Sequence, residues 1–193
     1  MKRVTIVFIA IILASFSLQE KNIEEFQSNI VLKSAYIFWE GANPFTTHRG
    51  TVKLKSGYLT IVNSQLLSGK FVVDMTTIHN REGHKKLEKH LKSANFFEVE
   101  KYPTATFVIT NVVQKHNKVQ ITGDVTIKGI TKQVSVNGVI LENDKAYIVR
   151  SEVFKLNRAE FNVKYMSKSF FKNLRDKFIN DDVNMSFSLK ILK

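Results

Sequence analysis

Residues 90–107, HLKSANFFEVEKYPTATF, decide the fold, because the chain changes conformation twice around them. At their start, Leu87 and Leu91 are one turn apart among charged residues, which is typical of an amphipathic helix, expected over 80–92. Tyr102-Pro103 ends the helical pattern, because proline fixes its own φ and disfavours the α region for the residue before it. Beyond the proline the polarity alternates, which predicts a strand. The side chains expected on one face of this strand are Ala105, Phe107 and Ile109.

Most of the remaining sequence is also typical of strands. Alternating segments occur at 34–40, 50–55, 58–63, 69–75, 119–127, 133–140, 146–156 and 183–191. The clearest turn signals between them are Ser56-Gly57 and Lys128-Gly129. Residues 157–182 are less regular, and their aromatic and leucine side chains follow at helix-like spacing, at Phe170-Phe171, Leu174 and Phe178.

About eight to ten strands joined by short turns, with one short helix inserted, predict an all-β antiparallel sheet. Such a sheet can hide an apolar face either as a sandwich or as a closed barrel. A barrel of about eight strands leaves an interior that side chains fill or that holds one small ligand.

The N-terminus has the features of an export signal. A basic start is followed by apolar residues at 4–13 and small residues at 14–17. The apolar run is shorter than the roughly 20 residues that a membrane span needs, and an uncleaved anchor is the alternative. We therefore predict a signal peptide over 1–18, a linker over 19–33 and one domain over 34–193, in a periplasmic or secreted protein.

Composition limits the chemistry that this protein can perform. The chain contains no cysteine, which excludes disulfides, thiol catalysis and thiolate metal sites. Its five histidines form no His-x-x-x-His or His-x-His pair, and Gly-x-Ser-x-Gly is absent. We therefore expect no metal site, no cofactor and no catalytic residues. The formal net charge of +12 fits either a solvated basic surface or attraction to an anionic membrane. Nucleic acid is not an expected partner, because the lysines are spread along the chain.

Two segments resemble the signatures of a known family. Residues 96–103, FFEVEKYP, and residues 121–132, ITGDVTIKGITK, resemble the YceI-like family of lipid/polyisoprenoid-binding proteins. Weaker similarity lies at 39–41, 48–50, 74–75, 90–92 and 157–161. The resemblance implies an extended lipocalin-like antiparallel β-barrel around an apolar tunnel that holds an isoprenoid or another long-chain amphiphile. It thus implies an exported carrier and not an enzyme. Asn95 and Arg175 depart from the family pattern, which bears on the identity of the ligand more than on the fold.

The inward apolar side chains are the candidate ligand-binding residues. By themselves they fit either a solid core or a lined tunnel, and the resemblance favours the tunnel. Moving a hydrocarbon chain out of water is worth about 0.8 kcal/mol for each methylene group. The candidates are Trp39, Phe71, Val73, Met75, Phe107, Ile109, Val125, Ile127, Phe154, Met185, Phe187 and Leu189.

Two functions from different classes follow. The first is binding and carriage of a long-chain lipid, isoprenoid or fatty-acid-like, inside the barrel in the periplasm. The alternative is a packed barrel with a structural or stress-response role, whose basic surface binds a macromolecular partner. A homodimer and a transient contact with an anionic membrane are further expectations. Four lysines on the expected helix fit either a solvated face or contact with anionic head groups, namely Lys85, Lys86, Lys89 and Lys92.

Overall fold

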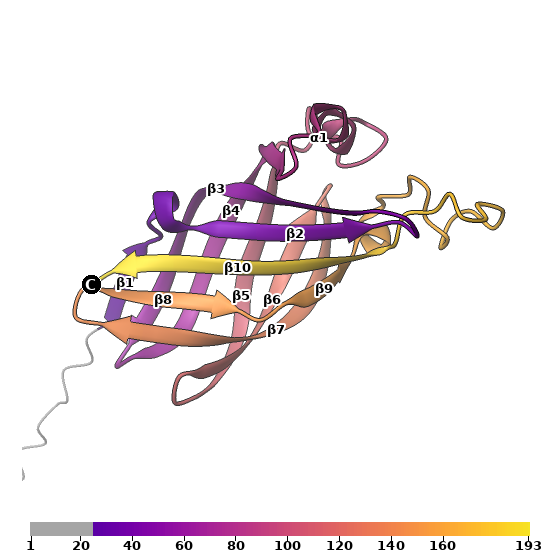
Figure 1. Ribbon diagram of the computed structural model, residues 1–193. Helices are drawn as coiled ribbons and strands as arrows, with labels where there is room; N and C mark the ends of the chain where they lie inside the picture. Colours follow the sequence, from indigo (N-terminus) through magenta and orange to yellow (C-terminus); the bar gives the residue numbers. More distant parts are fainter. Residues whose placement is uncertain (1–24) are drawn as a thin grey trace, which may run out of the picture.

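The computed structural model describes residues 25–193, which form one curved antiparallel sheet that closes on itself (Figure 1). The predicted signal peptide over 1–18 lies outside the described residues. The strands are β1 (Glu25–Asn29), β2 (Tyr36–Ala42), β3 (Thr47–Val62), β4 (Gln65–Asn80), β5 (Thr104–Lys115), β6 (Lys118–Ile127), β7 (Ile130–Asn143), β8 (Ala146–Ser151), β9 (Phe154–Asn157) and β10 (Asp182–Leu192). Between them lie the α-helix α1 (Lys85–Lys92) and the short 3-10 helices η1 (Leu32–Ser34) and η2 (Arg158–Phe161).

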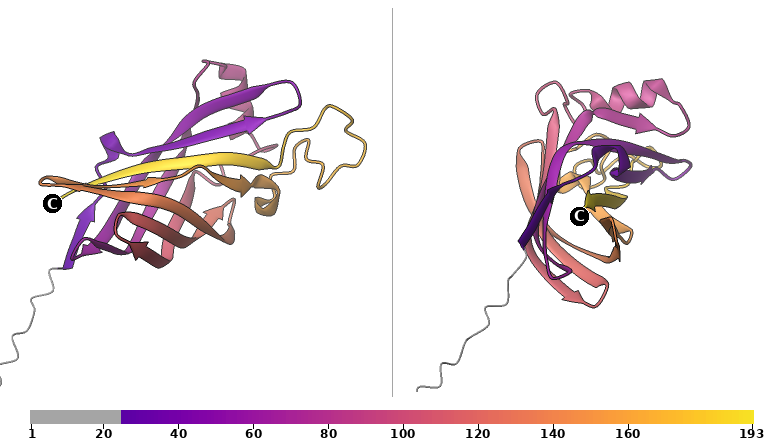
Figure 2. Two further views of the ribbon diagram at one scale, coloured as in Figure 1. Left: turned by 60° about the horizontal axis from the view of Figure 1, so that its bottom comes forward. Right: turned by 90° about the vertical axis from the view of Figure 1, so that its left-hand side faces the viewer.

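Strand pairing closes the barrel. The order is β1-β3-β2-β10-β8-β7-β6-β5-β4, and β4 pairs back with β3, which joins the two edges. Eight strands, β2 to β8 and β10, therefore form the ring, while β1 and β9 pair with β3 and β10. Figure 2 shows this ring from two further sides. The prediction of an all-β antiparallel barrel of about eight strands with one inserted helix is confirmed. No helix in residues 25–193 has the length and apolar character needed to cross a bilayer.

The barrel interior is packed solid at the end opposite α1. Leu59, Ile61, Ile121 and Leu189 belong to the same apolar core cluster, and each is at most 2% exposed. Because side chains alternate across a strand, these residues and the candidates nearer α1 share the inner face of the barrel. Any space for a ligand must therefore lie toward the α1 end.

The predicted turn at Ser56-Gly57 is wrong, because β3 runs through it without interruption. A Cβ on Gly57 would lie 2.7 Å from Ile30 Cδ1 and 2.8 Å from Phe71 Cβ, so this glycine permits close packing rather than a reversal. The reversal occurs at Asn63 and Ser64, whose positive φ values of 48° and 62° suit a two-residue hairpin turn.

The helix predicted over 80–92 begins five residues later than expected, at Lys85. Asn80 is instead the last residue of β4, which continues well past the predicted end of its segment at 75. The Asn80 side chain does act near the start of the helix, since its Oδ1 accepts a hydrogen bond from the backbone N–H of His84 at 3.0 Å.

Three other boundaries differ from expectation. The predicted linker over 19–33 includes β1 and the first two residues of η1, so regular structure begins before residue 34. The single strand predicted over 146–156 is divided into β8 and β9, where Phe187 N–H donates to the Ser151 hydroxyl at 2.8 Å instead of to a backbone carbonyl. No α-helix forms over 157–182, despite the helix-like spacing of its aromatic residues.

Candidate functional site

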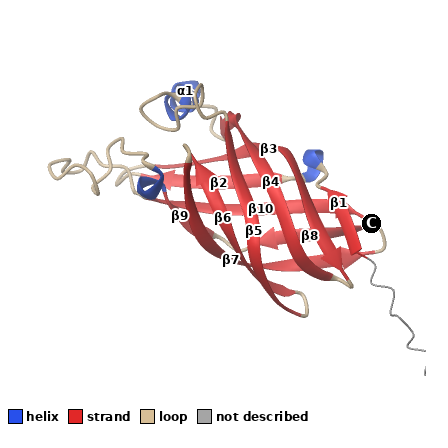
Figure 3. Cartoon of the chain, turned by 180° about the vertical axis from the view of Figure 1, so that it is seen from behind, coloured by secondary structure: helices blue, strands red, loops and turns tan. Residues whose placement is uncertain are grey.

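A cavity of about 280 Å³ lies at the α1 end of the barrel. Its volume is near the lower limit for small-molecule pockets. Figure 3 shows the elements around it: the ends of the barrel strands, α1, and the segment that follows η2. The cavity is partly open to solvent, and its lining is almost entirely apolar.

Ten of the twelve predicted ligand-binding residues line this cavity. They come from two groups of paired strands, β4, β5 and β6 on one side and β2, β10 and β9 on the other. The ten are Trp39, Phe71, Val73, Met75, Phe107, Val125, Ile127, Phe154, Met185 and Phe187.

The remaining two candidates, Ile109 and Leu189, are buried but do not line the cavity. Each lies two residues beyond a phenylalanine on the same strand, in the solid part of the core. The ring of Phe71 stacks on Phe107 with centroids 5.1 Å apart and contacts Phe187 at 5.7 Å. These three rings form the floor of the cavity and separate it from Ile109 and Leu189.

The wall near the opening comes from residues outside the twelve predicted ligand-binding residues, although the adjacent pair Phe96-Phe97 could be interpreted from the sequence either as a gate of the tunnel or as a plug of the barrel end. Leu87, His90 and Leu91 contribute from α1, and Phe96 and Phe97 follow directly after it. The one-turn spacing of Leu87 and Leu91 was a usable signal, since it marked an apolar helix face that needed a partner. On the other side of the opening, the lining residues include Arg158, Phe161, Val163 and Ile179.

Two buried nitrogen atoms belong to residues of this lining and have no hydrogen-bond partner among the described residues. They are Nε1 of Trp39 and Nε2 of His90. The His90 ring packs edge-on against Tyr165, with centroids 4.5 Å apart, and against Phe96 at 5.9 Å. Buried polar atoms are nearly always paired, so each nitrogen calls for a water molecule or a polar ligand group. The indole N–H can only donate, which requires an acceptor.

Arg158 holds the segment after η2 against the barrel. Its side chain is 2% exposed and donates to three backbone carbonyls: Val163 at 2.7 Å, Ile179 at 3.0 Å and Asn180 at 3.1 Å. Asp181 Oδ1 lies 3.2 Å from Nη2, and the guanidinium also lies over the Phe96 ring at 5.3 Å. Burial lowers the pKa of Arg158, and the charge of Asp181 opposes that shift. The arginine therefore supports the wall rather than offering a free charge to a ligand.

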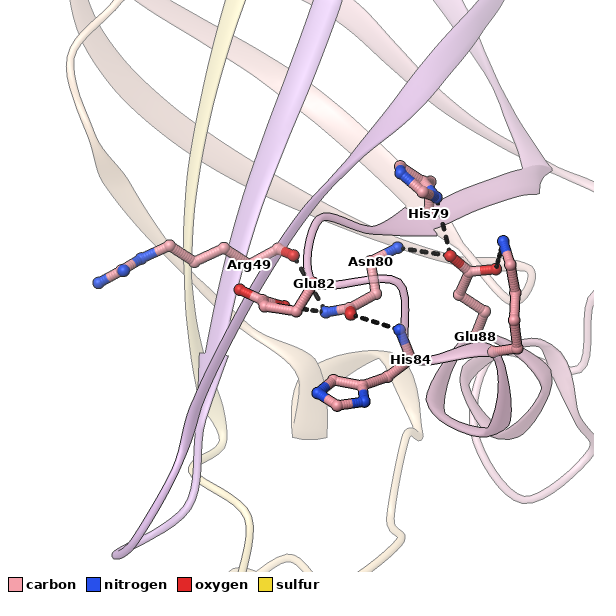
Figure 4. A network of polar contacts seen from close by, with 7 residues as sticks. Arg49, His79, Asn80, Glu82, His84 and Glu88 are labelled. Carbon is pink, nitrogen blue, oxygen red and sulfur yellow. Dashed lines mark hydrogen bonds and ion pairs between the residues drawn. The ribbon is translucent and has the colours of Figure 1, made fainter.

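Glu88 ties α1 to the end of β4 (Figure 4). Its Oε1 accepts from His79 Nδ1 at 2.8 Å and from Asn80 N–H at 2.9 Å, and its Oε2 pairs with Lys85 Nζ at 3.1 Å. Chiefly because of the Asn80 N–H, and next because of Lys85, the pKa of Glu88 falls to about 2, although burial acts in the opposite direction. These contacts hold the apolar face of α1 over the cavity.

We expect Glu88→Gln to weaken the protein at neutral pH and to reduce its sensitivity to acid. A lowered pKa in the folded state stabilises that state above the ordinary glutamate pKa, and this contribution is lost as pH falls from about 4.5 to 2. The melting temperatures of wild type and variant should therefore differ at pH 7 and converge near pH 2. Glu152→Gln, at an exposed glutamate without an ion pair in residues 25–193, is the control. Parallel melting curves for Glu88→Gln and wild type across this pH range would contradict the role of Glu88.

The fold and the cavity define a lipocalin-like antiparallel barrel that is solid at one end and has an apolar cavity at the other. The model of the YceI-like domain matches residues 22–191, and the chain therefore belongs to the YceI-like family. Protein YceI of Escherichia coli O157:H7 is 32% identical over 120 residues, which cover 60% of this chain and 63% of that relative. The chain thus matches less than two thirds of that relative's length.

Two solved structures share the fold. Burkholderia cenocepacia BcnA superposes with a TM-score of 0.70 at 21% identity, over 83% of this chain and 98% of BcnA. A polyisoprenoid binding domain from Saccharophagus degradans, implicated in plant cell wall breakdown, gives 0.63 at 11% identity, over 86% of this chain and 97% of that domain.

Proposed function

We propose that this protein binds and carries a long-chain amphiphile, an isoprenoid or a fatty-acid-like lipid, in the cavity of the barrel. The observation that carries the proposal is the cavity itself: about 280 Å³, apolar, open at one end and floored by three phenylalanine rings. A hydrocarbon chain entering it gains about 0.8 kcal/mol for each methylene group removed from water. Phenylalanine and methionine walls also adapt to different chains, because methionine repacks readily.

An amphiphile fits the site better than a pure hydrocarbon. The indole N–H of Trp39 and Nε2 of His90 have no partner within residues 25–193 and belong to lining residues, and a ligand oxygen could satisfy either. The lining contains three ionisable side chains, His48, His90 and Arg158, and backbone carbonyls already occupy Arg158. We infer binding rather than catalysis, because these groups supply no nucleophile next to a base.

The packed-barrel alternative requires an interior without space for a ligand, and the cavity disfavours it. Periplasmic location belongs to this proposal and rests on the predicted signal peptide over 1–18. Cell fractionation would test it, and recovery of the full-length chain in the cytoplasm would count against it. The homodimer stays a prediction, which native mass spectrometry would check.

Filling the cavity should abolish ligand binding. Ala105 lies on the inner face of β5 and lines the cavity, so Ala105→Trp places an indole in the space meant for the lipid. We expect organic extraction of purified wild type to release a lipid detectable by mass spectrometry, and the variant to release none. Val108→Trp, on the exposed face of the same strand, should retain the lipid. Repeated recovery of wild type without any bound lipid, or equal lipid in both variants, would contradict the proposal.

A further inference from the structure

The segment 162–181, NVKYMSKSFFKNLRDKFIND, lies between η2 and β10 at the open end of the cavity. Figures 1 and 3 both show it projecting from that end of the barrel. Part of it is wall, since Val163, Ile179 and Asn180 line the cavity. Tyr165 packs against His90, Ser167 is buried and Asp181 pairs with Arg158. Most of the other side chains of the segment are exposed and have no role in the binding site described above.

Exposed phenylalanines gather at this end. Phe170 is 42% exposed and Phe171 is 48% exposed, both in this segment. Phe45, in the connection between β2 and β3, is 80% exposed. The backbone N–H of Asn180 donates to the carbonyl oxygen of Ala42 at 2.8 Å, which holds the segment against the end of β2, where that connection begins. Single exposed apolar residues are common, but several large ones beside a cavity opening indicate a partner.

Basic side chains share this surface with the phenylalanines. The segment contains five, Lys164, Lys168, Lys172, Arg175 and Lys177, and none of them forms an ion pair in residues 25–193. The segment has two acidic residues, and Asp181 is already paired with Arg158. Asp176 is therefore the one acidic residue of the segment left to offset these five positive charges.

Two of these lysines lie over aromatic rings. Lys164 Nζ is 5.0 Å from the centroid of Phe170, and Lys168 Nζ is 3.4 Å from that of Phe178. A lysine that lies over an aromatic ring can keep its ammonium group in a polar environment while its methylene stem and the ring enter an adjacent apolar environment. Cation and ring therefore suit a partner that is anionic at its surface and apolar just beneath it.

We propose that the open end of the barrel docks on an anionic lipid bilayer through segment 162–181 and Phe45. The five cations meet the phosphate head groups, and the exposed rings enter the boundary between head groups and acyl chains. The cavity then opens toward the membrane surface, so that a lipid could enter without crossing bulk water. Docking itself does not require that the cavity bind a lipid, so it goes beyond the proposed function.

The test is sedimentation of the purified protein with phosphatidylcholine vesicles, with and without phosphatidylglycerol. We expect binding that requires phosphatidylglycerol and weakens as salt rises. Lys172→Glu with Lys177→Glu should weaken the partition constant about tenfold or more. Phe170→Ser with Phe171→Ser should weaken it even at low salt. Lys115→Glu with Lys118→Glu makes the same charge change at the far end of the barrel, beside the β5–β6 turn, and should leave most of the binding intact.

Three results would overturn the proposal. In the first, wild type binds both kinds of vesicle equally, and in the second, Lys115→Glu with Lys118→Glu weakens vesicle binding as much as the substitutions in the segment do. The third result is a wild type that binds no vesicles but forms a dimer that the substitutions in the segment dissociate. The last would assign the surface to a second copy of the chain. Ala105→Trp separates this proposal from the carrier function, since it should still bind vesicles while losing the extracted lipid. If wild type releases lipid on extraction but does not bind vesicles, the docking proposal is wrong and the proposed carrier function is unaffected.

Discussion

Replacing Arg158 with methionine is expected to lower the free energy of unfolding by about 3–5 kcal/mol. The guanidinium is buried, donates to three backbone carbonyls and pairs with Asp181. Methionine has a similar length but no donors, so the variant leaves three carbonyls without their donor. The Asp181 carboxylate loses its cation and keeps only the hydroxyls of Ser167 and Ser169, which donate to Oδ2. Unpaired buried groups of this kind give some of the largest effects of single substitutions.

Urea unfolding followed by circular dichroism would measure this loss. Arg150→Met is the matched control, because Arg150 is exposed on β8 and has no ion pair in the described part of the chain; we expect it to change stability by less than about 0.5 kcal/mol. Amide hydrogen exchange should also quicken across 162–181 in Arg158→Met before it quickens in the barrel strands. Equal stability of the two variants would show that Arg158 does not hold this segment.

The ring of strands could be predicted because alternation is a local signal. On β5 and β10 the polarity pattern alone indicated that Ala105, Phe107 and Phe187 face inward, and all three do. Whether a strand continues or turns at a given residue is not a local property, because it also depends on the strands that pair with it. Ser56-Gly57 has the composition of a turn, but both residues pair with β4, and the Ile30 N–H donates to Gly57 O at 2.9 Å from the other side. The ladder with β1 begins at the next residue, Tyr58, and these contacts keep β3 extended.

The same difference between local and long-range signals explains why the segment 162–181 does not form an α-helix. Its aromatic spacing resembles one face of a helix, but a short helix is stable only when that face packs against something. Here Phe170 and Phe171 face solvent, and Arg158 fixes the segment through backbone carbonyls instead. A buried arginine with carbonyl partners more than twenty residues away has no local sequence signature.

The depth of the cavity could not be predicted either. Phe107 and Ile109 are both inward residues of β5, and their pattern in the sequence is the same. One lines the cavity and the other does not, because at that level the Phe71 ring of β4 stacks on Phe107 and also contacts the Phe187 ring of β10. Where a barrel interior becomes solid is decided by contacts among strands that are far apart in the sequence.

Introducing a charge at this level should therefore empty the site and destabilise the barrel. Phe187 is 5% exposed and contacts both Phe71 and Phe154. Phe187→Asp removes those ring contacts and buries a carboxylate without a partner, and we expect a loss of about 4 kcal/mol or more together with loss of the extracted lipid. Phe107→Asp should behave in the same way, because its ring stacks on Phe71 in the same floor.

Phe38→Asp supplies the control, since Phe38 lies on β2 and is 45% exposed on the outer face. That variant should keep both the lipid and most of its stability. If Phe187→Asp does not fold, Phe187→Leu gives the decisive measurement: a smaller side chain deepens the cavity, so the bound lipid should shift toward longer chains in the mass spectrum. Retained lipid of unchanged length in folded Phe187 variants would mean that the ligand never reaches the phenylalanine floor.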